Sequence, residues 1–119
     1  MKLRISSISE RGNLEGERIA LKANSDGDAG RYAVFKGITK PTGVASGNIA
    51  NVYWFMDKQF KAGDFIVLYS KEGRRSEKKN DDGTTSYFFY WGLSLPIWTA
   101  GATPVLVETA TWSFGSPIE

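Results

Sequence analysis

The stretch that decides the fold of this chain is Asn51-Val-Tyr-Trp-Phe-Met-Asp-Lys-Gln-Phe-Lys-Ala-Gly-Asp-Phe-Ile-Val-Leu-Tyr-Ser70. Aromatic and β-branched residues fill 52–56 and 65–70, and these residue types favour strands. The segment between them, 57–64, is mostly polar and contains one glycine, which predicts a turn. We therefore interpret the stretch as a strand–turn–strand hairpin at the centre of a β fold, with its second strand buried on both faces.

Similar strand patterns recur on both sides of this hairpin. Further strands are predicted at 3–8, 18–23, 31–38, 84–91 and 105–114, and the first needs a bulge because its apolar alternation slips. The segments between them predict a loop at 39–48, a solvated and mobile charged loop at 71–83, and an irregular segment at 92–103 that Ile97 and Trp98 pin and Pro104 ends. About seven short strands without helical periodicity predict an all-β, immunoglobulin-like β-sandwich, with one domain over 1–114 and a frayed tail at 115–119.

Composition excludes several classes of chemistry. The chain has 119 residues with no cysteine and no histidine, so disulfides, thiolate zinc sites and serine–histidine or cysteine–histidine catalysis are excluded. Fifteen basic and 13 acidic residues give a net charge of +2, which attracts nucleic acid only weakly. We find neither a secretory signal pattern nor an apolar run of the roughly 18 residues that a membrane span needs. We therefore expect a cytoplasmic protein that uses no cofactor and is not an enzyme.

The order of the motifs resembles the lamin-tail domain over residues 13–109. Asn13-Leu-Glu-Gly-Glu-Arg-Ile-Ala-Leu-Lys-Ala-Asn24 resembles its opening strand and Asn-rich turn, and Tyr53-Trp-Phe55 with Phe60-Lys-Ala-Gly-Asp-Phe-Ile-Val-Leu-Tyr69 resembles its next hairpin. Trp91, Pro96-Ile-Trp98, Gly101 and Val105-Leu-Val107 resemble its tryptophan segment and following strand. Two features depart from the family pattern: Tyr32 stands where the family usually has tryptophan, and the 39–48 insert is long. The resemblance implies an immunoglobulin-like sandwich that acts as an interaction module.

Aromatic residues occupy both faces of the predicted strands at 52–56 and 84–91. Because only one face of a sandwich strand points inward, some of these rings should lie at the surface or under a loop such as 39–48 or 92–103. Exposed rings and neighbouring guanidinium groups are typical of a binding surface. The predicted binding residues are Tyr53, Trp54, Phe88, Tyr90, Trp98, Arg74 and Arg75.

Acidic residues give weaker signals. Asn24–Asp28 and Asn80–Gly83 have the oxygen-rich composition of calcium loops, but both lack the closing glutamate and read better as plain turns. Asp57, Asp64 and Glu108 could form a carboxylate pair, although nothing in the sequence fixes their separation. In the charged loop, four acidic residues offset the phosphate-binding potential of Arg74, Arg75, Lys78 and Lys79. We therefore predict no catalytic and no metal site.

Three functions remain open from the sequence. The first is a protein–protein module that binds a partner, or a second copy of this chain, through an edge strand and the outward aromatic rings. The second is a carbohydrate-binding module in which Trp54 or Trp98 stacks on sugar rings. The third is a single-stranded nucleic-acid binder that uses Tyr87, Phe89 and Trp91, which the near-neutral charge disfavours. A short chain without catalytic groups also suits an accessory protein of a phage or mobile element.

Overall fold

The computed structural model of the chain describes residues 1–40, 43–44 and 51–115. In chain order the strands are β1 Leu3–Ser9, β2 Arg18–Ala23, β3 Gly27–Asp28, β4 Tyr32–Lys40, β5 Gly43–Val44, β6 Val52–Trp54, β7 Gln59–Phe60, β8 Phe65–Tyr69, β9 Ser76–Lys79, β10 Thr85–Tyr90 and β11 Ala102–Glu108. The 3-10 turn η1, Ala29–Arg31, lies between β3 and β4. Among the described residues no helix has the length and apolar composition to cross a bilayer. The all-β prediction is confirmed.

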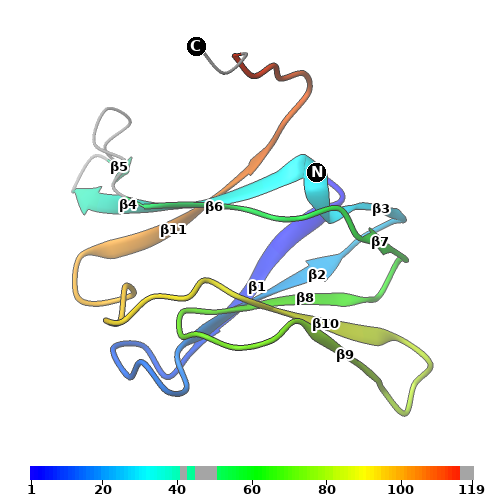
Figure 1. Ribbon diagram of the computed structural model, residues 1–119, viewed down its shortest axis with the longest axis horizontal. Coiled ribbons are helices and arrows are strands. Elements are labelled where there is room, and N and C mark those ends of the chain that lie inside the picture. The colour runs from blue at the N-terminus through cyan, green and yellow to red at the C-terminus, as the bar shows by residue number, and fades with distance from the viewer. Residues whose placement is uncertain (41–42, 45–50, 116–119) are drawn as a thin grey trace.

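The strands form two main sheets that pack face to face (Figure 1). The large sheet has the order β1-β2-β8-β10-β9, and its β8–β10 pair is parallel whereas its other pairs are antiparallel. In the small sheet β4 lies between β11 and β6, and β5 pairs with the far end of β4. The short strands β3 and β7 pair with each other. This arrangement is sandwich-like, and the C-terminal segment leaves β11 on the side of the small sheet that faces away from the large one (Figure 1).

The core lies between the two sheets and follows the alternation of each strand. In β2 the side chains of Ile19 and Leu21 are fully buried, while Arg18 and Lys22 point to the other face. Trp98 from the irregular segment 92–103 fills the core beside them and is 1% exposed. The prediction that Ile97 and Trp98 pin this segment is confirmed.

The predicted bulge in the first strand is also confirmed. The pairing of β1 with β2 shifts between Ile5 and Ser7: Ile5 pairs with Leu21 and Ser7 with Ala20, so β1 contains one extra residue between these two pairs. The extra residue turns both Ile5 and Ile8 toward the core, where they pack against it. The slipped alternation in the sequence is therefore the direct signature of this bulge.

The predicted hairpin over 51–70 is wrong. β6 pairs with β4 in the small sheet, whereas β8 lies between β2 and β10 in the large sheet. The intervening residues cross from one sheet to the other, and β7 pairs with β3 on the way. β8 is the most apolar strand and is buried over Ile66–Leu68, so it takes a central position with a neighbour on each side.

The short strands β3, β5, β7 and β9 form where the sequence predicted none, and β11 has other bounds than predicted. The charged loop 71–83 contains β9, an edge strand whose four exposed residues pair with β10. Pro104 does not end a segment but lies inside β11, which ends at Glu108 rather than continuing to 114. The backbone N–H of Thr109 points toward β4, where it donates to the carbonyl of Arg31. Because N–H directions alternate along a strand, the backbone nitrogen of Pro104 points away from β4, so proline costs the sheet no hydrogen bond at this position.

The predicted loop 39–48 is partly strand, because β4 continues to Lys40 and β5 follows at Gly43–Val44. The rest of that loop, 41–42 and 45–48, lies outside the described residues, and so do 49–50 and the part of the predicted tail at 116–119.

Candidate functional site

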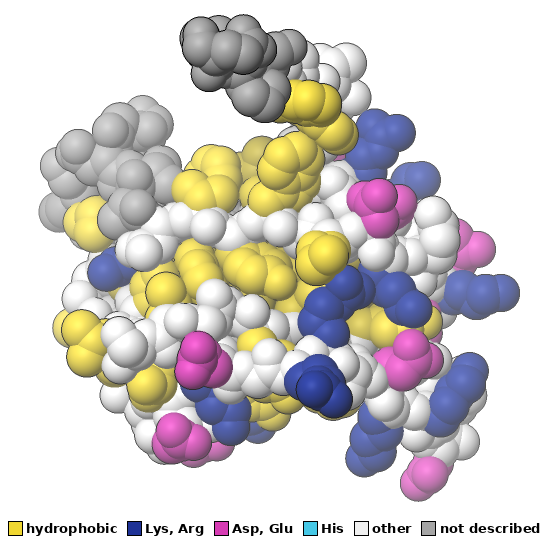
Figure 2. All heavy atoms as spheres, viewed as in Figure 1, with side chains coloured by type: hydrophobic (Ala, Val, Ile, Leu, Met, Phe, Trp, Pro, Cys, Tyr) yellow, Lys and Arg dark blue, Asp and Glu magenta, His cyan; other side chains and the backbone are white. Residues whose placement is uncertain are grey.

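The outer face of the small sheet carries no charged side chain at any of its described strand positions. We call this surface the uncharged face; from β6, β4 and β11 it contains Val52, Trp54, Ala33, Phe35, Gly37, Thr39, Thr103, Val105 and Val107. Figure 2 shows hydrophobic side chains gathered on this side of the molecule. A sheet face turned to water normally carries polar residues, so a face without charge is typical of a contact surface.

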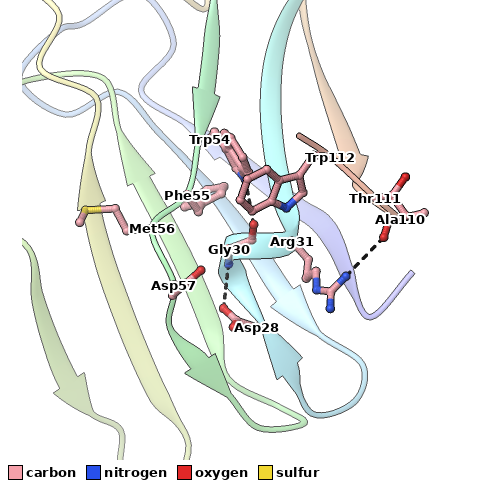
Figure 3. Close-up of a pocket in the computed structure, with 10 residues that line it drawn as sticks. All are labelled: Asp28, Gly30, Arg31, Trp54, Phe55, Met56, Asp57, Ala110, Thr111 and Trp112. Atoms are coloured by element: carbon pink, nitrogen blue, oxygen red, sulfur yellow. Dashed lines mark hydrogen bonds between the residues drawn. The ribbon is translucent and has the colours of Figure 1, made fainter. Parts of the chain in front are cut away.

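A groove of about 780 Å³ lies at one end of the uncharged face (Figure 3). Trp54 and Trp112 form its aromatic wall, with ring centroids 5.0 Å apart and ring planes at 83°. Both indoles are about half exposed, at 47% and 55%. Arg31 and Asp57 line the groove beside the rings, so it offers apolar ring surface together with groups of both charges.

Backbone acceptors hold the two sides of this groove in place. The Trp54 indole N–H donates to the carbonyl of Gly30 at 2.8 Å. The backbone N–H of Thr109 donates to the carbonyl of Arg31 at 2.7 Å, and its hydroxyl donates to the same carbonyl at 3.0 Å. Asp28 caps the turn between these acceptors by accepting the N–H of Gly30 at 2.9 Å. The turn η1 therefore positions both Trp54 and the start of the C-terminal segment.

The structure separates the predicted binding residues onto different surfaces. Trp54 lies on the uncharged face, whereas Phe88 and Tyr90 lie half-buried on the outer face of the large sheet. Arg74 is exposed, and Arg75 lies with its guanidinium 4.5 Å from the Phe89 ring centroid, beside β9. These residues do not form one site, because β6 and β10 belong to different sheets.

Two of the predicted rings point into the molecule. Trp98 is 1% exposed, so it cannot present its ring to a sugar or a partner. Tyr53 packs against Phe55 and Trp91, with ring centroids 5.0 and 5.6 Å away, and its burial raises the pKa of its hydroxyl. Their inward direction follows from strand alternation at Tyr53 and from the fold of the irregular segment at Trp98.

The rings proposed for nucleic acid also lie on the inner side. Phe89 is 1% exposed, and Tyr87 and Trp91 pack against the core. The shared face that the sequence predicted for Tyr87, Phe89 and Trp91 is therefore correct, but it is the core face. The other face of β10, with Phe88 and Tyr90, is the one that looks outward.

The three candidate carboxylates occupy three unrelated environments. Asp57 lines the groove. Asp64 is buried and accepts the backbone N–H groups of Lys61 and Thr85 at 2.8 and 2.9 Å. Glu108 accepts the hydroxyl of Tyr32 at 2.9 Å. Asp64 and Glu108 thus accept hydrogen bonds that connect separate segments of the fold.

The two acidic turns use their oxygens in the same way. Asp26 accepts the N–H of Ala62 at 2.9 Å, and Asp82 accepts the N–H and the hydroxyl of Thr84. These hydrogen bonds hold down the pKa of the Asp82 carboxyl. Within the described ranges, no group of three or more carboxylates is placed to hold a metal ion.

Glu17 is the most buried ionisable group of the described chain, with no exposed surface. Its carboxylate accepts four hydrogen bonds: from the N–H of Gly12 at 2.8 Å, Ile97 at 2.8 Å and Trp98 at 3.2 Å, and from the Ser70 hydroxyl. Burial alone would raise the pKa of Glu17, but these donors stabilise the charge and lower it below its ordinary value. The group therefore ties the turn at Gly12, Ser70 and the segment 97–98 to the start of β2.

No family model matches this chain, and no curated protein matches it. The lamin-tail resemblance is therefore supported only as far as a mostly-β, compact domain.

Sequence reasoning missed Trp112 and the uncharged face. Trp112 was placed in a closing strand, but it follows β11 and packs edge-to-face against Trp54 in the aromatic wall of the groove. The face had a visible signal, since the alternate positions of two strands that include Ala33, Phe35, Val105 and Val107 carry no charged residue. That signal was hidden because the pairing of β4 with β6 and β11 was not predicted.

Proposed function

We propose that this protein is a non-catalytic interaction module that pairs with a second copy of itself through the uncharged face. The observation that carries the proposal is the absence of charge at all nine described positions of that face, in a chain that is 24% charged. Removing apolar surface from water contributes about 25 cal/mol per Å². Two sheets of this kind can stack about 10 Å apart, as the two sheets of a sandwich do.

A second copy fits this face better than a charged partner would. Two uncharged faces meet without like-charge repulsion and leave no charge to be desolvated. The groove at the end of the face carries both Arg31 and Asp57, so two copies related by a two-fold axis can pair opposite charges at the rim. The contact would therefore be self-complementary.

Self-association by strand addition at a sheet edge is less favoured than contact through the uncharged face. β9 presents Lys78 and Lys79, β1 contains a bulge, and β11 contains Pro104, all of which hinder strand addition. β6 is an edge of three residues. The proposal therefore replaces the edge strand expected from the sequence with a sheet face.

A lysine in the centre of the uncharged face is expected to abolish pairing. Val105→Lys places a charge opposite Phe35, where a second copy would have to desolvate it. Sedimentation velocity over a concentration series should show a dimer for the native protein and a monomer for the variant. Ala20→Lys is the matched control, because it adds the same charge to the outer face of the large sheet. A native protein that stays monomeric up to its solubility limit would refute the proposal.

A second candidate function, carbohydrate binding, is favoured by the groove itself. Trp54 presents a half-exposed ring beside Asp57 and Arg31, which supply acceptors and donors for hydroxyl groups. On a glycan array we expect any binding to disappear with Trp54→Ala and to persist with Val105→Lys. An array without hits would remove this candidate.

The lamin-tail resemblance agrees with the proposal, because such domains act as interaction modules. It adds no partner chemistry of its own. A cytoplasmic location stays a prediction from the sequence.

A further inference from the structure

The outer face of the large sheet differs in composition from the uncharged face. Its central strands place aromatic side chains next to one another: Phe65 and Tyr69 of β8 beside Phe88 and Tyr90 of β10, with Val67 between them. The rings of Tyr69 and Tyr90 stack at 5.2 Å and 13°, and Phe88 lies 6.3 Å from Tyr69. We call these four rings the aromatic strip.

Basic side chains flank the aromatic strip at both ends. At one end Lys22 of β2 lies over the Phe65 ring, with its ammonium 5.3 Å from the centroid, and Arg4 of β1 pairs with Lys22. Lys78 of β9 lies on the same row, opposite Ser86. At the other end Arg18 and Lys71 lie 5.7 and 5.4 Å from the centroid of Tyr69. The outward positions of these paired strands carry cations and rings but no acidic residue.

Within the part of the chain that the structure describes, the acidic groups near this face come from the loops at its margins. Glu10 pairs with Arg18 at 3.0 Å, and Glu15 lies 3.8 Å from Lys71, with 84% of the Glu15 side chain exposed. The pKa of Asp82 is lowered mainly by its hydrogen bonds from Thr84, and the nearby charge of Lys22 adds to this lowering. Exposed pairs of this kind contribute little energy, so a polyanion can displace them.

We infer that the outer face of the large sheet binds single-stranded nucleic acid, with bases on the aromatic strip and phosphates on the flanking cations. This ligand class combines the two features of the surface: flat rings that stack on aromatic side chains, and a charge at regular intervals. The inference does not rest on the proposed self-association, because it uses the opposite face of the sandwich.

The existing cation–π contacts show how binding would proceed. Lys22 now covers the ring of Phe65, and Arg18 and Lys71 cover the ring of Tyr69. When a strand arrives, these flexible side chains can move to the phosphates and leave the ring faces to the bases. The ring of Tyr90 is covered by two neighbours, since Tyr69 stacks on it and the backbone at Gly73 lies so close that a Cβ there would be 2.4 Å from it. We therefore assign stacking to Phe65, Tyr69 and Phe88, and a supporting role to Tyr90.

The test measures fluorescence anisotropy of a labelled oligothymidylate with the native protein. We expect binding that weakens with salt, and a slope of log K against log salt that falls by about 0.7 when Lys78→Gln removes one phosphate contact. Phe88→Leu keeps the apolar volume but removes a stacking ring, and should weaken binding about tenfold. The control Lys58→Gln, whose ammonium lies over the inner ring Tyr87, should leave affinity and slope unchanged.

Two further arms separate this inference from its alternatives. Val105→Lys, on the opposite face, should bind oligothymidylate with native affinity whether or not the native protein pairs with itself. Unlabelled polyphosphate, which has charge but no bases, should compete poorly. Absence of binding, equal competition by polyphosphate, or an unchanged affinity in Phe88→Leu would each overturn the inference.

Discussion

Replacing Glu17 with alanine is expected to leave the protein largely unfolded at room temperature. The substitution removes the acceptor of three backbone N–H groups and of the Ser70 hydroxyl, all of which meet at a carboxylate without exposed surface. Each buried donor left without a partner costs about 1–3 kcal/mol. Three of the four donors are buried, so their combined cost of about 3–9 kcal/mol is a large part of the stability of a small domain, about 5–15 kcal/mol. Circular dichroism with urea titration measures the loss.

The matched control for Glu17→Ala is Glu15→Ala, two residues earlier. The Glu15 side chain is 84% exposed, and its one ion pair, with Lys71, is 3.8 Å long. Surface substitutions of this kind usually change stability by less than about 0.5 kcal/mol. Equal urea midpoints for the two variants would contradict the anchoring role of Glu17.

The same carboxylate predicts the response of the fold to acid. The folded pKa of Glu17 is lower than its ordinary value of 4.5, so the ionised group stabilises the folded state above that pH. This contribution is lost as pH falls from the ordinary value through the folded pKa. We expect the stability of Glu17→Gln to be lower at neutral pH and to depend less on pH in this range than that of the native protein.

Replacing Trp98 with alanine is expected to cost about 3–5 kcal/mol of stability. The indole is 1% exposed and packs against Trp91, with ring centroids 6.2 Å apart, so its removal leaves a cavity between the sheets. Trp112→Ala is the control of the same residue type, since its ring is 55% exposed. Urea unfolding at concentrations where the protein is monomeric should separate the two variants by several kcal/mol. A similar small loss in both would show that Trp98 does not pin segment 92–103.

Local patterns predicted individual strands well. β2 has the predicted bounds, and the bulge in β1 was readable from the slip between Ile5 and Ile8. Strand pairing was predicted poorly, because adjacency in sequence suggested a hairpin between β6 and β8. β9 was missed because an exposed edge strand needs no apolar residue, and its pairing with β10 alone defines it.

The surfaces were predictable only in part. The alternation in 84–91 correctly placed Phe88 and Tyr90 on the face opposite Tyr87, Phe89 and Trp91, but it did not indicate which of the two faces points away from the core. Glu17 was not predictable, because a glutamate beside a polar turn looks solvated, and its donors come from positions 12, 70, 97 and 98. The uncharged face required knowing that β4, β6 and β11 are neighbours.

The central claim is that a second copy binds the uncharged face. Isotope-filtered nuclear Overhauser spectra of a mixed sample, with one copy labelled and the other not, report contacts between copies directly. We predict intermolecular signals among Phe35, Val105 and Val107, and none involving Phe88 on the opposite face. Intermolecular signals from Phe88, or the absence of any signal between copies, would contradict the claim.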